Sequence, residues 1–113
     1  MAGQSVAFHV LLTAVAERDI AALHDYVARS AGDSQADHLL DRLMEAMDGL
    51  AHFPERGSHP KELLALGIKE YRQVFFKPYR LIYRVTGKQV LVHLVVDGRR
   101  DMQSVLARRL LDA

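Results

Sequence analysis

Residues 69–96 read KEYRQVFFKPYRLIYRVTGKQVLVHLVV and decide the fold of this chain. Three segments within them are rich in Val, Ile, Phe and Tyr, which favour strands. They are Lys69–Phe76, Tyr79–Val85 and Gln89–Val96. Only Lys77-Pro78 and Gly87-Lys88 separate them, and connections this short join antiparallel neighbours. The stretch therefore predicts a three-stranded antiparallel sheet.

A two-residue turn at Gly87-Lys88 also fixes a register. It places Arg84 opposite Leu91, Ile82 opposite His93, and Arg80 opposite Val95. One face of this hairpin is then almost entirely apolar and must be covered by helices. Its members are Tyr79, Leu81, Tyr83, Val85, Val90, Val92, Leu94 and Val96. The opposite face carries Arg80, Arg84 and His93 and is only partly apolar.

The residues before this sheet predict a short strand and two helices. Val6–Leu12 is an apolar run suited to a first strand, and Thr13 can cap the helix that follows. Apolar residues at helical spacing then form two stripes, one on each of two predicted helices. Gly32-Asp33 ends the first helix, and Ser34 begins the second. The first stripe is Ala16, Ile20, Leu23 and Val27. The second is Ala36, Leu39, Leu40, Leu43, Met44, Met47 and Leu50, opposite an acidic face of Asp37, Asp41, Glu45 and Asp48. This pattern is typical of a helical hairpin.

The remaining segments complete one domain over residues 1–113. Pro60–Leu64 can form a single helical turn, and Asp101 can cap a last helix over Met102–Leu111. The predicted fold class is α+β with the order β-α-α-β-β-β-α, in which an N-terminal helical hairpin packs on a small antiparallel sheet.

The composition bears on the cellular compartment and on the charge of the binding partner. The chain has no cysteine, and no apolar run approaches the ~20 residues that a membrane span needs. We therefore expect a cytoplasmic protein without membrane contact. Residues 1–55 hold nine acidic and three basic residues, a net charge of −6, whereas residues 56–113 hold five acidic and twelve basic ones, a net charge of +7. Either the second half meets an anionic partner, or the halves neutralise each other within the fold.

Several motifs of the second half, taken together, resemble a known family. They are Tyr71-Arg72, the segment Tyr79–Val85 (YRLIYRV), Gly98–Asp101 (GRRD) and Leu106–Leu110 (LARRL), preceded by Leu50–Pro54 (LAHFP) and Gly57. In this order and spacing they resemble toxins of the RelE/ParE superfamily, which belong to type II toxin–antitoxin systems. The resemblance implies a cognate antitoxin, encoded beside the toxin, whose C-terminal segment folds as it binds.

The superfamily contains two activities, so the fold alone does not decide the target. RelE-like members cleave messenger RNA at the ribosome, and ParE-like members poison DNA gyrase. Arg72, Arg80 and Arg100 match basic positions of the RelE type, but Val74 stands where another cation belongs. Leu106 stands where a proton-transferring Tyr or His belongs, and no Tyr or His follows His93. RNA cleavage needs proton transfer as well as a cation, so this comparison favours the ParE-like branch and a gyrase inhibitor without enzymatic chemistry.

Two alternatives remain open. One is a ribosome-dependent endoribonuclease that uses Arg72, Arg80, Arg100 and His93. The other is a weakly toxic member that only binds its antitoxin.

Six arginines are candidate contacts with the target or the antitoxin. They are Arg80, Arg84, Arg99, Arg100, Arg108 and Arg109. The structural alternative for Arg80 and Arg84 is a cross-strand salt bridge or surface solvation. For Arg99 and Arg100 it is attachment of the last helix to the sheet, and for Arg108 and Arg109 it is a solvated helix end. The six histidines show no spacing suited to zinc, so we expect neither a metal nor a cofactor. Binding to a specific nucleic-acid sequence is not expected either.

Overall fold

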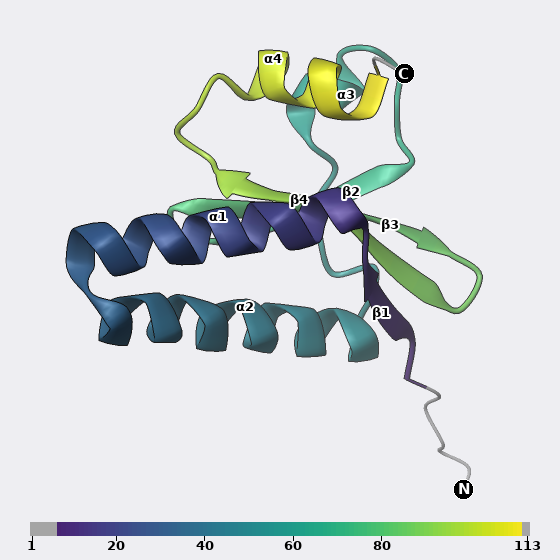
Figure 1. Ribbon diagram of the computed structural model, residues 1–113. Coiled ribbons are helices and arrows are strands. Elements are labelled where there is room, and N and C mark those ends of the chain that lie inside the picture. The colour runs from purple at the N-terminus through teal and green to yellow at the C-terminus, as the bar shows by residue number, and fades with distance from the viewer. Residues whose placement is uncertain (1–6, 112–113) are drawn as a thin grey trace, which may run out of the picture.

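The computed structural model describes residues 7–111 and confirms the α+β class (Figure 1). Its elements are β1 (His9–Leu12), α1 (Ala14–Ala31), α2 (Asp33–His52), α3 (Lys61–Leu64), β2 (Tyr71–Phe76), β3 (Tyr79–Thr86), β4 (Gln89–Asp97), α4 (Met102–Leu106) and a π-helical turn η1 (Ala107–Leu111). The order of strands and helices is the predicted one. Of the predicted first strand, Val6 lies outside the described residues. The last helix changes from α to π geometry at Ala107.

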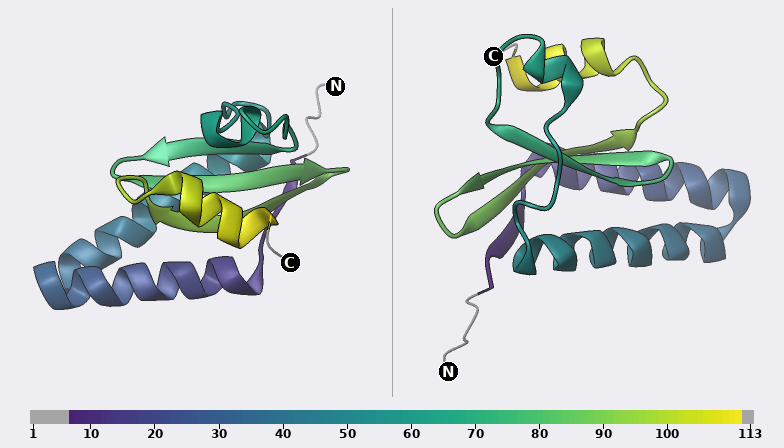
Figure 2. Two further views of the ribbon diagram at one scale, coloured as in Figure 1. Left: turned by 90° about the horizontal axis from the view of Figure 1, so that it is seen from above. Right: turned by 180° about the vertical axis from the view of Figure 1, so that it is seen from behind.

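The sheet has the strand order β1-β4-β3-β2. Strands β2, β3 and β4 are antiparallel, as predicted, but β1 pairs in parallel with β4, so the sheet is mixed. Figure 2 shows that the α1–α2 hairpin covers one face of the sheet while α3 and α4 lie across the other. No helix among residues 7–111 has the length and apolar character needed to cross a membrane.

The cap of the first helix and most of the buried residues of the helical hairpin agree with the prediction. The Thr13 side chain accepts a hydrogen bond from the Ala16 N–H and so caps α1. Gly32, whose φ of 98° suits glycine, precedes α2, which starts at Asp33 and not at Ser34. Met44 was expected in the core, but this prediction is wrong, because its side chain is 55% exposed. Met44 lies with Phe8 and Met47 beside β1, where they line a groove on the surface of the described residues.

The β3–β4 register departs from the prediction at one residue. Arg84 pairs with Leu91 as expected, but a bulge follows, so Ile82 pairs with Leu94 and Arg80 with Val96. His93 is the extra residue, and an extra residue reverses the alternation of the side chains after it. Val95, not Leu94 or Val96, therefore faces the helical hairpin.

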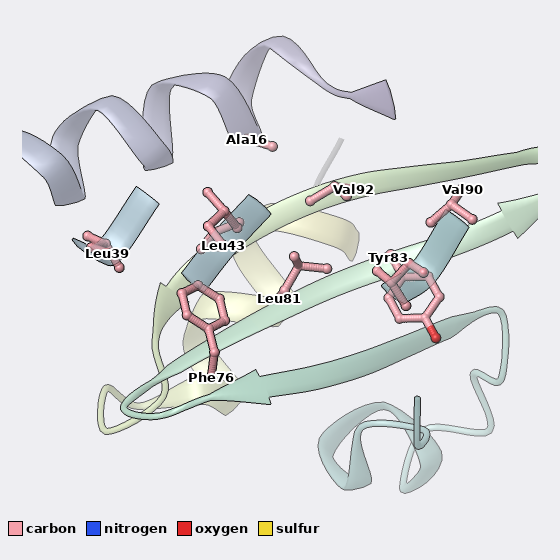
Figure 3. Close-up of a cluster of buried hydrophobic side chains, with 10 residues drawn as sticks. Ala16, Leu39, Leu43, Phe76, Leu81, Tyr83, Val90 and Val92 are labelled. Carbon is pink, nitrogen blue, oxygen red and sulfur yellow. The ribbon is translucent and has the colours of Figure 1, made fainter. Parts of the chain in front are cut away.

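The sheet consequently has a core on each face. The first core lies under the helical hairpin and includes Leu43, Leu81, Tyr83 and Val92 (Figure 3). Val95 also belongs to this core. The second core consists of Leu63, Ile82, Leu94, Val96, Met102, Val105 and Leu106. Only one covered face was expected, and the bulge explains why Leu94 and Val96, which were assigned to it, belong to the second core.

Candidate functional site

A polar groove lies on the second face of the sheet, beside the end of β4. It has a volume of about 670 Å³, and we call it the Arg80 groove. The residues that matter for its chemistry are His59, Lys61, Glu62, Phe75, Arg80 and Arg100. The α3 turn supplies Lys61 and Glu62, β2 and β3 supply the floor, and the loop after β4 supplies Arg100. The groove therefore brings together Arg80 of the YRLIYRV motif and Arg100 of the GRRD motif.

Arg80 is neutralised inside this groove. It is 6% exposed, and its two terminal nitrogens donate hydrogen bonds of 3.0 Å to the two carboxylate oxygens of Glu62. Its Nε donates to Gln73 Oε1 at 2.9 Å, and its Nη2 contacts the same oxygen. The hydrogen bonds from Arg80 hold the pKa of Glu62 below its ordinary value of 4.5. Arg80 thus forms a salt bridge, but with Glu62 of α3 and not across strands as expected, and its charge is already compensated.

Two other cations of the groove are exposed. Lys61 and Arg100 make no ion pair with any residue between 7 and 111. The nearby carboxylate of Asp101 is engaged elsewhere, because it accepts hydrogen bonds from the N–H and the hydroxyl of Ser104 and caps α4 as predicted. Lys61 and Arg100 can therefore receive an anionic group from a partner.

His59 is a groove residue that the sequence analysis did not select. Its Nδ1 lies 3.1 Å from the backbone oxygen of Tyr71. A carbonyl only accepts, so Nδ1 must carry the proton, and in the neutral ring Nε2 is then the acceptor. The sequence offered little signal for this position, because His59 stands in a loop between Ser58 and Pro60, outside any regular pattern.

Arg84 and His93 form a separate cluster with Tyr71. Arg84 lies over the Tyr71 ring at 5.9 Å, and the His93 ring meets Tyr71 edge-on at 5.3 Å. Arg84 Nε and His93 Nε2 are buried and have no hydrogen-bond partner among residues 7–111. Burial, and secondarily the charge of Arg84, lowers the pKa of His93 below 6.5. Since Ile82 stands between Arg80 and Arg84 on β3, this cluster is distinct from the Arg80 groove.

Arg72 belongs to neither group. Its Nη1 donates hydrogen bonds to the backbone oxygens of Glu55 and Gly57, at 3.2 and 2.9 Å. In β2 it alternates with Tyr71 and Gln73, so it lies on the opposite face of the sheet. Of the predicted nuclease set, the structure brings together only Arg80 and Arg100.

The remaining candidate arginines have three different surroundings. Arg109 forms two hydrogen bonds of 3.0 and 2.8 Å with the Asp19 carboxylate and is largely buried, so it attaches the last helix. The expectation of a solvated helix end is therefore wrong for Arg109. Arg99 pairs with Asp97 at the surface and lowers the pKa of that carboxyl. Arg108 is exposed. Arg99, Arg100 and Arg108 are therefore the candidates most accessible to a partner.

An apolar groove runs beside α2 and β1. Two adjoining hollows of about 360 and 730 Å³ share Phe8, and we call them together the α2 groove. Met44 and Met47 line one hollow, and Phe53, which is 67% exposed, lines the other. An exposed apolar surface of this kind is typical of a protein-binding site.

The model of the family described as "ParE toxin of type II toxin-antitoxin system, parDE" matches residues 10–102. The chain belongs to the ParE toxin family. No curated protein sequence matches it.

Solved structures share the fold of this ParE-family toxin at low sequence identity. A chromosomal ParDE toxin–antitoxin system from P. aeruginosa matches with a TM-score of 0.67 and 18% identity, over 82% of this chain and 98% of that chain. The RelBE2 toxin–antitoxin complex from Mycobacterium tuberculosis matches with a TM-score of 0.60 and 22% identity, over 83% and 94%. An arginine-to-alanine double mutant of E. coli RelE in the free state matches with a TM-score of 0.53 and 17% identity, over 92% of this chain and 98% of that chain. These likenesses establish the fold.

Within residues 7–111 of this ParE-family toxin, no group of three or more His, Asp or Glu side chains is placed to hold a metal ion. The surfaces suited to function are thus the Arg80 groove, the α2 groove and the exposed arginines at the start and end of the last helix. Each is a surface for binding, and the Arg80 groove also holds His59 beside the exposed cations Lys61 and Arg100.

Proposed function

We propose that this ParE-family toxin inhibits DNA gyrase by protein–protein contact in the cytoplasm and is neutralised by a cognate antitoxin. The observation that favours gyrase over messenger RNA as the target is that the charge of Arg80 is already neutralised. Its guanidinium is buried and satisfied by Glu62 and Gln73, so it is not free to stabilise the charge that develops on a phosphate during RNA cleavage. Arg72 and His93 lie outside the groove, as described above.

The proposed antitoxin contact uses two surfaces of different chemistry. The α2 groove offers Phe8, Met44 and Phe53 to apolar side chains of an amphipathic segment. Lys61 and Arg100, which form no ion pair within residues 7–111, offer positive charge to its carboxylates. Arg80 and Arg84, which the sequence analysis also assigned to this contact, are less accessible, so Arg100 takes the larger share. Two of the solved relatives are a ParDE system and a RelBE2 toxin–antitoxin complex, which supports an antitoxin for this chain.

A second candidate function is ribosome-dependent cleavage of messenger RNA, and His59 is the observation that favours it. His59 Nε2 could remove the proton from a ribose 2′-hydroxyl, while Arg100 and Lys61 of the same groove stabilise the charged phosphate. The leaving 5′-oxygen would also need a proton donor, and either Lys61 or His59 after it has gained the first proton could supply it. The nuclease ranks below the gyrase inhibitor because Arg80 is already neutralised by Glu62 and Gln73.

Inducing the toxin alone in bacteria separates these functions. We expect growth arrest with gyrase-linked DNA breaks and intact transcripts, and we expect His59→Ala to remain as toxic as the wild type. Cut transcripts with undamaged DNA, abolished by His59→Ala and by Arg100→Ala, would establish the nuclease instead. Normal growth with soluble protein present would identify a weakly toxic member that only binds its antitoxin.

A further inference from the structure

Strand β2 forms one edge of the sheet, and part of that edge is already covered. The N–H and C=O of Gln73 exchange hydrogen bonds with Ser58, and the Tyr71 C=O receives one from His59. Alternate residues of a strand direct their backbone groups to the same side, so those of Phe75 also point away from β3. Phe75 is therefore the next position on the outer edge.

The backbone of Phe75 is left uncovered. Neither its N–H nor its C=O makes a hydrogen bond with any other described residue, and its side chain is 57% exposed. Uncovered edge groups readily pair with another chain. Elsewhere the molecule protects an edge: where β1 ends, the Asp19 carboxylate accepts the Val95 N–H of β4. The edge at Phe75 has no such cover among residues 7–111.

Positively charged grooves lie on both sides of this open edge. Phe75 lines the Arg80 groove on one face of β2, and on the other it lines a hollow of about 330 Å³ that we call the Arg42 groove. The Arg42 groove also contains Arg42, Arg56 and a single acidic residue, Glu45. None of Lys61, Arg100, Arg42 and Arg56 forms an ion pair among the described residues. Two unpaired cations thus flank Phe75 on each face.

We propose that the Phe75 edge binds an extended acidic segment of the antitoxin as an added strand. This inference rests on the proposed antitoxin and names the chemistry of its contact. The segment would form two main-chain hydrogen bonds with Phe75. Because successive side chains of a strand point to opposite faces, neighbouring carboxylates would enter the Arg80 groove and the Arg42 groove. A second copy of the toxin is a poor occupant, since it would bring like-charged grooves together.

The direct test is amide hydrogen exchange, measured by NMR on the toxin alone and in complex with the product of the adjacent antitoxin gene. We expect the Phe75 amide to exchange at least about tenfold more slowly in the complex, because a hydrogen-bonded amide exchanges only on opening. A complex in which Phe75 exchanges as fast as in the free toxin overturns the added strand and leaves the antitoxin proposal standing. Protection of Val10 on β1 instead of Phe75 would also overturn it and assign the other sheet edge. If no complex forms, the antitoxin proposal itself fails.

Charge-reversal variants test the two grooves separately. We expect Lys61→Glu/Arg100→Glu and Arg42→Glu/Arg56→Glu each to weaken antitoxin binding at least about tenfold, a loss typical of charge pairs at an interface. Arg29→Glu on the exposed side of α1 is the control and should change affinity less than about twofold. Phe75→Pro, which removes the free N–H, should weaken binding more than Phe75→Ala, which keeps it. Unchanged affinity in both double variants, with NMR spectra of folded protein, contradicts the proposal.

Discussion

Arg109 and Asp19 form a bidentate ion pair that joins the last helical segment to the first helix, across 90 residues of sequence. Asp19 also accepts the Val95 N–H at 3.1 Å, and Arg109 Nη2 lies 3.4 Å from the His93 oxygen. The pair therefore satisfies backbone groups of β4 that face outward beyond the end of β1. It closes the sheet edge at the bulge and fixes the helix that carries the C-terminal arginines.

Removing this ion pair should destabilise the fold. We expect Asp19→Ala to lower the free energy of unfolding by about 2–4 kcal/mol, since it leaves the mostly buried Arg109 charge and the Val95 N–H without a partner. Arg29→Ala breaks the exposed Arg29–Asp25 pair and is the matched control, with an expected change within about 0.5 kcal/mol. Urea denaturation measures both, and equal losses would contradict the assigned role.

The Arg80–Glu62 pair should make stability depend on pH in the acid range. The pKa of Glu62 is lowered in the folded protein, so its contribution is fully present above the unfolded value near 4.5 and is lost as the pH falls through the folded value. We expect Glu62→Gln to be less stable than the wild type at pH 7 and the difference to shrink below pH 4.5. Denaturation at a series of pH values tests this, and a difference that does not change with pH would count against the pair.

Local patterns were sufficient to predict most of the fold. Thr13 and Asp101 have the capping roles that their positions indicated, and the Gly87-Lys88 turn sets the Arg84–Leu91 pair as expected. The bulge at His93 was not predictable from alternation, because Leu94 and Val96 are as apolar as Val95. The parallel pairing of β1 with β4 depends on contacts between distant segments, which the pattern of one short strand does not encode.

His93 should make the protein less stable in mildly acid solution. Its folded pKa is lowered, so the unfolded chain binds the proton more readily, and stability should decline as the pH falls below about 6.5 until the folded value is reached. His93→Phe removes the titrating group and should remove this part of the decline. Arg84→Met should reduce it, because the repulsion from Arg84 is gone. Thermal unfolding between pH 5 and 8 is the measurement, and identical profiles for the three proteins would contradict this prediction.

Tyr83 should couple the loop after α2 to the sheet. Its hydroxyl donates to the Pro54 oxygen at 2.7 Å and accepts the Gly57 N–H at 3.1 Å, while its ring lies in the first core (Figure 3). We expect Tyr83→Phe to cost about 1–3 kcal/mol, because the buried Gly57 N–H loses its acceptor. Tyr26→Phe, at a residue that is 66% exposed, is the control and should be close to neutral. A negligible loss for Tyr83→Phe would show that water replaces the hydroxyl.

The candidate site was less predictable than the fold. The motif arginines could be recognised, but not the residues that neutralise them. Glu62 lies 18 residues before Arg80 and Asp19 lies 90 before Arg109, and no local pattern connects either pair. His59 enters the Arg80 groove because Ser58 pairs with Gln73, a single bridge outside the named strands. These contacts decide which arginines remain available to a partner.

We propose that gyrase, and not messenger RNA, is the target of this toxin. The most direct measurement adds the purified toxin to purified gyrase with relaxed plasmid, and in parallel to a translation extract with labelled messenger RNA. We predict that supercoiling is inhibited at near-stoichiometric toxin, that the antitoxin restores it, and that the RNA stays intact. Unaffected supercoiling together with cut RNA would contradict the account.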